Sequence, residues 1–212
     1  MVKGALMSEV NLKALEDELF RCGLASFRKI KAAHPTDRFY CYAFYTSGEF
    51  GYVVATASTY EGLEQVARRY KTTLSAYKDV PIEDLRLDLK WSPCDSPLHD
   101  QADDPLHEMA PLIRSVEAEL TRLFDLFEVG PAFDAFVDQV EECFARALRR
   151  IDATGIFGQG DERDGVVVNL LMGDQSDEAR IEFAYRVNPP QAVRMLIDDL
   201  AAQGALGAYD DE

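Results

Sequence analysis

Carboxylate side chains at two predicted turns are the residues best placed for chemistry in this chain. Asp174, Asp177 and Glu178 directly follow the apolar run VVVNLLM, and the ends of strands often carry functional groups. Glu49 lies in a turn that contains two glycines. Such carboxylates could form an acid–base pair or contact a basic partner. We select these four residues as candidate partner-binding residues and assign no catalytic residue, because Asp177 and Glu178 equally suit the first turn of a helix capped by Ser176.

The loop 92–104 brings thiol, imidazole and carboxylate groups together in sequence, and zinc accepts all three as ligands. Cys94, His99 and His107 follow a C-x4-H-x7-H spacing, which matches no standard zinc site, and the chain has no second compact pair of ligands. We therefore predict a solvated loop, with no metal and no cofactor. The cysteines lie far apart and form no C-x-x-C motif, which predicts free thiols in a reducing cytoplasm; they are Cys22, Cys41, Cys94 and Cys143.

Motifs that identify the common enzyme classes are missing from the sequence. There is no G-x-S-x-G, no H-E-x-x-H, no P-loop and no EF-hand spacing, and the chain has only 3 histidines. The glycines of GIFGQG at 155–160 read G-x-x-G-x-G, which is not the dinucleotide-binding order, and they follow a helix pattern instead of a strand. We interpret this segment as a flexible connection, and the sequence assigns no reaction.

Charge is the largest departure from an average composition: 22 basic residues against 38 acidic ones give a net charge of −16. Nucleic acid is not expected as a direct ligand, because phosphates are bound by clustered Lys and Arg. The charge suits a basic protein partner, since complementary potentials speed encounter, and it equally suits solubility alone. No apolar run approaches the ~20 residues needed to cross a bilayer, and the amino terminus lacks a signal-peptide pattern, so we expect a cytoplasmic protein without a membrane span.

A β-hairpin followed by a helix is the strongest structural signal among the elements that must position these residues. The aromatic run 39–46 predicts a strand that is covered on both faces. Strict alternation places Phe39 and Cys41 on the same face of that strand. A short turn and a return strand follow, and the capping-box spacing of Ser58 and Glu61 predicts the start of the next helix.

Apolar periodicity predicts the other elements. Residues 177–187 fit both a strand and a helix; we favour a helix, because Ser176 can cap it and Asn188-Pro189 can end it. The first helix carries Gly23 as a mild weakness, and its late basic residues suit the helix dipole. The predicted helices are 8–33, 58–78, 105–127, 131–151, 177–187 and 189–203, and the predicted strands are 39–46, 52–57, 85–91 and 166–172.

These elements predict an α+β fold, in a single layered domain over residues 1–212. The sheet is expected to be mostly antiparallel, with about four to five strands, and the packed helices include a long αα-hairpin at 105–152. Strand 85–91 is expected at an edge, because alternate residues are polar, and strand 166–172 at the centre, because its apolar run is continuous. Residues 1–7 are expected to form an extension and residues 204–212 a loose acidic tail.

Two segments of the chain, with the helices between them, resemble the bacterial DUF4303 family, a domain of unknown function. The segments are FYCYAFYTSGEFGYVVATASTYEGL and FGQGDERDGVVVNLLMGDQSDEARIEFAYRVNPP. The resemblance covers nearly the whole chain. It carries over no catalytic residue; the positions that match the recurrent pattern are Asp174, Ser176, Asp177, Asn188 and Pro189. Members of the family resemble small acidic proteins of toxin–immunity neighbourhoods, which implies an immunity-like role.

Three hypotheses about function follow. The first is an acidic cytoplasmic protein-binding module, immunity-like, that neutralises a basic protein partner. The second is a small-molecule-binding protein or enzyme with a pocket between the sheet and the 105–152 helical hairpin. The third is an oligomeric scaffold in which a helix stripe self-associates, although no sequence feature indicates a homo-oligomer.

Overall fold

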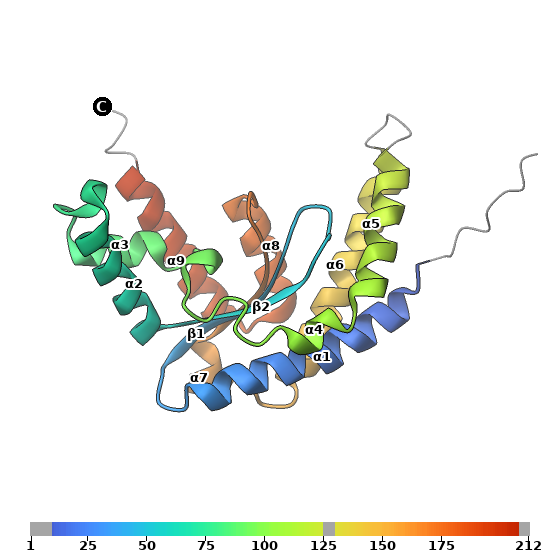
Figure 1. The fold of residues 1–212 in the computed structure, drawn as a ribbon, viewed down its shortest axis with the longest axis horizontal. Coiled ribbons are helices and arrows are strands. Elements are labelled where there is room, and N and C mark those ends of the chain that lie inside the picture. The colour runs from blue at the N-terminus through green and yellow to red at the C-terminus, as the bar shows by residue number, and fades with distance from the viewer. Residues whose placement is uncertain (1–9, 125–129, 208–212) are drawn as a thin grey trace, which may run out of the picture.

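Helices cover both faces of a small sheet in the computed structural model, which describes residues 10–124 and 130–207 (Figure 1). The strands are β1 (Phe39–Thr46), β2 (Val54–Thr59) and β3 (Val167–Met172). The longer helices are α1 (Leu12–Ala33), α2 (Tyr60–Thr73), α3 (Ile82–Leu89), α5 (Ala110–Phe124), α6 (Pro131–Asp152), α8 (Asp177–Val187) and α9 (Pro190–Gly207). Short helical turns occur at α4 (Asp104–His107), α7 (Asp161–Asp164), η1 (Ser75–Tyr77) and η2 (Pro93–Asp95).

The sheet has three strands in the order β2-β1-β3, with β1 antiparallel to β2 and parallel to β3. The α+β class is thus confirmed, but the predicted sheet of four to five mostly antiparallel strands is wrong. β1 is the central strand, while β3, expected at the centre, lies at an edge. α8 packs beside β3, and the Asn188 side chain pairs with the backbone N–H and C=O of Val168, at 2.7 Å each. Apolar burial of β3 therefore comes from helices, not from a further strand.

Residues 82–89 form helix α3, so the strand predicted at 85–91 is wrong. The alternating leucines also satisfy a helix, because Leu85 and Leu89 lie one turn apart and are both buried. Pro81 precedes the helix, and Glu83 in its first turn suits the positive end of the helix dipole. These local start signals, with burial of one helix face, outweigh the period of two.

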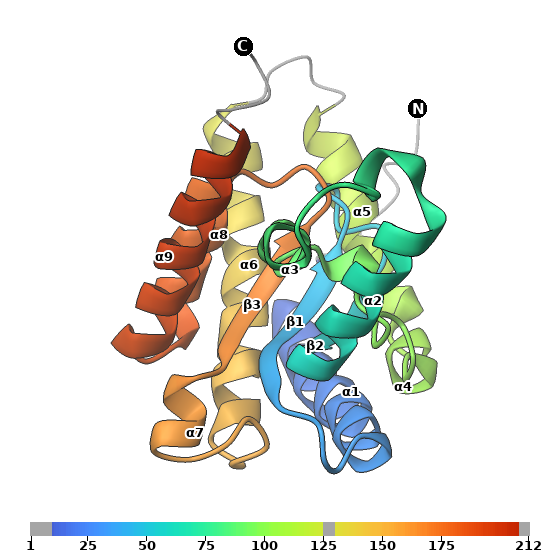
Figure 2. The ribbon, with the colours of Figure 1, turned by 90° about the vertical axis from the view of Figure 1, so that its left-hand side faces the viewer.

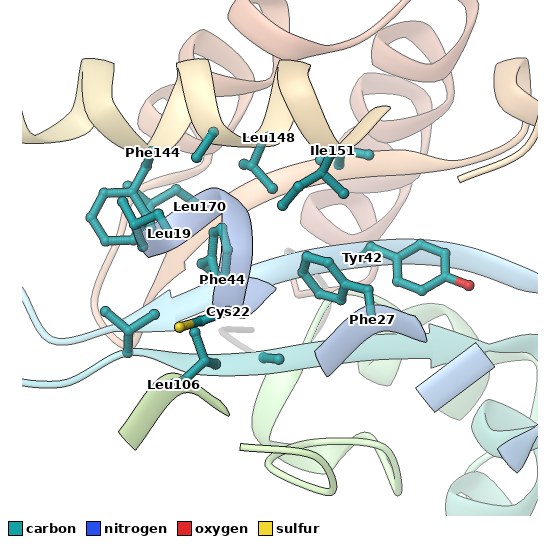
Figure 3. Packing of buried hydrophobic residues seen from close by; sticks show 14 of the residues in the cluster. Leu19, Cys22, Phe27, Tyr42, Phe44, Leu106, Phe144, Leu148, Ile151 and Leu170 are labelled. Carbon is teal, nitrogen blue, oxygen red and sulfur yellow. The ribbon is translucent and has the colours of Figure 1, made fainter. Parts of the chain in front are cut away.

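Two apolar cores lie on opposite faces of the sheet. In Figure 2, α2, α3 and α9 lie in front of the strands, whereas α1 and α6 lie behind them. Tyr40 belongs to the front core, while Tyr42 and Phe44 belong to the back core with α1, α4, α5 and α6 (Figure 3). α1 approaches β1 closely because Gly23 has no side chain: a Cβ there would stand 2.9 Å from Phe44 Cε1 and 3.1 Å from Ile151 Cδ1. Packing therefore requires Gly23, and the small loss of helix propensity is secondary.

The helix starts follow the predicted capping chemistry with small shifts. α2 begins one residue later than expected, since Ser58 is part of β2 and the Thr59 hydroxyl accepts a hydrogen bond from the Gly62 N–H at 3.0 Å. Asn11 caps α1, and the predicted cap Ser8 lies outside the described residues. The helix predicted at 177–187 is confirmed, with its cap at Ser176.

The predicted αα-hairpin is formed by α5 and α6, which pack against each other. The helix predicted over 105–127 is divided into α4 and α5, and its last residues lie outside the described ranges. α9 continues to Gly207, so the prediction of a loose tail from residue 204 is wrong for residues 204–207. The predicted extension at residues 1–7 and the rest of the predicted tail, residues 208–212, lie outside the described residues. Within the described ranges, no helix combines the length and the apolarity needed to cross a bilayer.

Candidate functional site

The parallel pairing of β1 and β3 brings the four sequence-predicted candidates to one end of the sheet. The last residues of the two strands are paired, so the turn that carries Glu49 and the turn that carries Asp174 both leave from the carboxyl ends (Figure 2). Glu49, Asp174, Asp177 and Glu178 are all exposed. This end of the sheet therefore presents carboxylates to solvent.

Helix capping accounts for part of this acidic group. The Ser176 hydroxyl accepts a hydrogen bond from the Ala179 N–H at 3.3 Å. The pKa of Glu178 is lowered by its own backbone N–H and by the Ser176 hydroxyl. Asp177 Oδ1 lies 3.7 Å from Arg180 Nη1 on the same helix. Asp177 and Glu178 thus stabilise the first turn of α8, and this structural role alone accounts for their presence there.

A hollow of about 570 Å³ lies at the opposite end of the sheet, where β1 and β3 begin. This volume is within the usual range of small-molecule sites. Its walls are the end of α1, the connection to β1, the start of β1 and the turn before α7. We call it the basic–aromatic pocket, and its main lining residues are Arg28, Lys31, His34, Asp37, Arg38, Phe39, Tyr42, Phe157 and Glu162.

Aromatic rings form one wall of the basic–aromatic pocket. Phe39 stacks on Tyr42 with ring centroids 4.8 Å apart and an angle of 13° between the planes. Tyr42 also packs against Phe157 at 4.9 Å. The strand register shifts between Phe39 and Cys41, so Phe39 lies on the Tyr42 face and the predicted alternation, with Phe39 and Cys41 on one face, is wrong. This irregularity of the strand is what creates the stack.

Tyr42 has an unsatisfied hydroxyl group. The residue is 1% exposed, and its hydroxyl has no hydrogen-bond partner among the described residues. Figure 3 shows this hydroxyl pointing away from the other labelled side chains of the core. Burial, and secondarily the charge of Glu162, raise the pKa of Tyr42, so the group is protonated at neutral pH and can donate a hydrogen bond. An unmade bond of this kind costs about 1–3 kcal/mol.

Basic side chains surround the aromatic wall. Lys31 Nζ lies 3.8 Å from Glu162 Oε1, and Arg38 Nε lies 2.9 Å from Glu61 Oε1. Arg28 is exposed and has no ion pair with any described residue. The cations Arg28, Lys31 and Arg38 outnumber the acidic lining residues Asp37 and Glu162, and in a chain of net charge −16 this small local excess of positive charge favours an anionic ligand there.

The cysteine and histidine candidates show no shared centre among the residues that the structure describes, where no group of three or more potential metal ligands comes together. Burial raises the pKa of Cys22 to about 11 and that of Cys41 to about 12, so these thiols are protonated and unreactive. Cys94 is exposed, and the His99 ring lies edge-on to Tyr45 at 5.2 Å.

The space between β1 and the α5–α6 hairpin, where our second hypothesis places a pocket, contains packed aromatic rings. Phe144 of α6 contacts Phe44 and Phe50 at centroid distances of 5.6 and 5.8 Å. All three rings are fully buried. The larger hollow at the amino ends of the strands is therefore the better place for a planar ligand.

Sequence reasoning missed the basic–aromatic pocket because each part has a sufficient local explanation. Arg28 and Lys31 suit the negative end of a helix dipole, and Phe39 and Tyr42 suit a buried strand. The available signal was the closeness in sequence of a basic helix end to an aromatic strand. That signal indicates a pocket only when two structural facts are known: the register shift in β1, and the position of residues 156–157 in the wall of the same hollow.

Comparison with known proteins gives one match. The family model of DUF4303, described as a domain of unknown function, matches residues 20–189, which include both ends of the sheet. No curated protein and no solved structure matches the chain.

Proposed function

The chain belongs to the DUF4303 family, and we propose that it is a binding protein that holds a small planar organic anion in the basic–aromatic pocket. The observation that carries this proposal is that Tyr42 is a lining residue of the pocket and that its buried hydroxyl has no partner among the described residues. Buried polar groups are nearly always hydrogen-bonded, so a ligand acceptor at this position would complete the site.

The other lining residues indicate the kind of ligand. The ring of Phe39, which is partly exposed and stacks on the buried Tyr42, offers a flat apolar surface to a planar group. Arg28, Lys31 and Arg38 supply positive charge at its border, where a carboxylate or phosphate of the ligand would lie. The ligand is therefore expected to combine a ring system with an anionic substituent.

Replacing Tyr42 with phenylalanine tests this proposal, because it removes only the hydroxyl. Isothermal titration calorimetry with AMP, GMP, orotate and 2-naphthoate measures binding of a planar anion. We expect the wild-type chain to bind at least one of them and Tyr42→Phe to weaken that binding about tenfold. The same variant is expected to keep the thermal stability of the free chain or to raise it slightly, because an unpaired buried hydroxyl is removed.

Two further variants separate charge at the pocket from charge elsewhere. Arg28→Gln is expected to weaken binding, with a smaller effect at high salt. Arg194→Gln is the matched control, since Arg194 lies on α9 with its side chain 84% exposed, and it is expected to change nothing. Failure of the whole panel to bind, or equal affinity of Tyr42→Phe and wild type, would contradict the proposal.

A basic protein partner at the carboxyl end of the sheet is our second proposal. The exposed Glu49 and Asp174, together with Tyr52, which is 44% exposed, support it. A pull-down with Glu49→Lys/Asp174→Lys tests it against the wild type. The wild type is expected to retain a basic protein at about 50 mM salt and to lose most of it at about 500 mM, while the variant retains none at either.

The matched control for the pull-down is Asp134→Lys/Asp138→Lys, which reverses two exposed charges on α6 and is expected to behave as wild type. Equal retention by the two double variants would show that net charge, not this end of the sheet, governs capture. That result would remove the second proposal and leave the first unaffected.

A further inference from the structure

A second hollow lies at the carboxyl ends of β1 and β3. Ligands of parallel sheets commonly bind outside this end of the strands. The hollow has a volume of about 200 Å³, which gives room for a small molecule only. We call it the carboxyl-end cavity, and the lining residues that matter for its chemistry are Tyr45, Asp88, Trp91, Cys94, Gly173 and Arg180.

Arg180 places a poorly compensated positive charge in this cavity. Its side chain is 18% exposed, and its Nε has no hydrogen-bond partner among the described residues. Its ion pair with Asp177 is long, at 3.7 Å, and the Asp177 side chain is 55% exposed. A guanidinium group that is mostly buried normally has close acceptors, and since the one ion pair of Arg180 with a described residue is long, its positive charge remains to be neutralised by a ligand.

Other polar groups at this end of the sheet also lack partners among the described residues. His99 Nδ1 and Gln175 Oε1 are buried and unpaired; His99 packs against Tyr45, and Gln175 lies two residues after Gly173. The Tyr45 hydroxyl borders the cavity beside Gly173, where a Cβ would stand 3.0 Å from it. His99 and Gln175 lie near the cavity without lining it, and the lining itself combines the polar side chains of Asp88 and Arg180 with the aromatic residues Tyr45 and Trp91.

We propose that the carboxyl-end cavity binds a small zwitterion of the amino-acid type, with its carboxylate on Arg180 and its ammonium group toward Asp88. A guanidinium fork matches the two oxygens of a carboxylate. Asp88 lines the cavity and Asp177 flanks Arg180, so a doubly charged anion such as phosphate would be repelled, whereas a zwitterion satisfies both signs of charge. This site is separate from the basic–aromatic pocket.

Isothermal titration calorimetry of the full chain with each of the twenty amino acids tests the proposal. At least one amino acid is expected to bind at least tenfold more tightly than its two halves, which for alanine are propionate and ethylamine. Arg180→Gln is expected to weaken that binding at least tenfold. Asp88→Asn is expected to remove most of the preference for the amino acid over the carboxylate alone.

The controls keep the two sites and the fold distinct. Arg194→Gln and Tyr42→Phe are each expected to leave amino-acid binding unchanged. Thermal unfolding of each variant identifies loss of fold, and if Arg180→Gln does not fold, Asp88→Asn decides the question, because Asp88 is exposed on α3. The proposal is overturned if no amino acid binds, if Arg180→Gln binds as the wild type does, or if propionate binds as tightly as alanine.

Discussion

Replacing Arg163 with methionine is expected to lower the free energy of unfolding by about 3–5 kcal/mol, the usual cost of breaking a buried ion pair from one side. The Arg163 side chain is 9% exposed, and its Nε lies 2.9 Å from both carboxylate oxygens of Asp152. Nη1 donates to the Val166 carbonyl at 2.5 Å, and Nη2 donates to the Val187 carbonyl and to Asn188 Oδ1 at 3.1 Å each. The methionine side chain has a similar length but no N–H group, so it removes the donor from all four acceptor groups: the Asp152 carboxylate, the two backbone carbonyls and the Asn188 amide.

Urea denaturation at pH 7, followed by circular dichroism, measures the loss. Arg163→Lys keeps the charge but not the planar fork, so its stability is expected to lie between those of methionine and wild type. The matched control is Arg194→Met at an exposed position, where a change within about 0.5 kcal/mol is expected. A loss of less than about 1 kcal/mol for Arg163→Met would show that the cluster does not hold this part of the fold together.

Asn188 of the same cluster has a structural role at the edge of the sheet. Its Nδ2 donates to the Val168 carbonyl at 2.7 Å and to the Ala184 carbonyl at 2.9 Å, while its Oδ1 accepts from the Val168 N–H at 2.7 Å. The Asn188 side chain thereby forms hydrogen bonds with the backbone N–H and C=O of Val168 at the edge of β3, as a neighbouring strand would. Asn188 is therefore architectural, and our ligand proposals depend on other residues.

Sequence patterns are sufficient where one local signal dominates. The bounds of β1, Phe39–Thr46, are as predicted, because an uncharged aromatic run between polar turns has few other solutions. The helix at 177–187 follows from its cap at Ser176. At 85–91 two signals compete, and tertiary burial of Leu85 and Leu89 on one helix face decides for a helix. The predicted fourth strand depended on that one segment, whereas the parallel pairing of β1 with β3 had no local signal in the sequence.

The candidate sites depend on contacts that sequence does not reveal. Gly23 reads as a weak point of a helix until Phe44 is found beside it. Phe39 joins Tyr42 only because the strand register shifts, and the Tyr42 hydroxyl is notable only because nothing described reaches it. The position of Asp174 near the carboxyl end of the sheet was predictable, because it directly follows a strand. The partly buried charge of Arg180 at the same end was not predictable.

Glu142→Gln is expected to give the largest pH-dependent effect, because Glu142 is the centre of the ion-pair network between α6 and α8. Its Oε1 accepts from Arg146 Nε at 2.9 Å and from Arg149 Nη2 at 2.8 Å, and its Oε2 accepts from Arg186 Nη2 at 2.8 Å. Burial alone would raise the pKa of Glu142, yet the hydrogen bonds from Arg186, Arg149 and Arg146 lower it from 4.5 to about 2. The carboxylate is therefore charged in the folded chain over most of the acidic range.

A folded-state pKa below the ordinary value stabilises the fold at every pH above that ordinary value, and the contribution is lost as pH falls from 4.5 toward 2. The stability difference between wild type and Glu142→Gln is thus expected to be largest at neutral pH and to shrink by about 1–2 kcal/mol across this window, a figure reduced for partial exposure of the side chain. Glu141, whose pKa is raised by burial, pairs with the same Arg186 as Glu142, so the comparison is repeated in a Glu141→Gln background to remove its titration from the difference. Urea denaturation in steps from pH 7 to pH 2.5 measures the difference, with Asp134→Asn at an exposed position of α6 as the control that keeps a constant offset. A difference for Glu142→Gln that stays constant with pH would mean that the three arginines do not hold this carboxylate in its charged form, and that the other contacts between α6 and α8, which include Glu141 with Arg186, join the two helices.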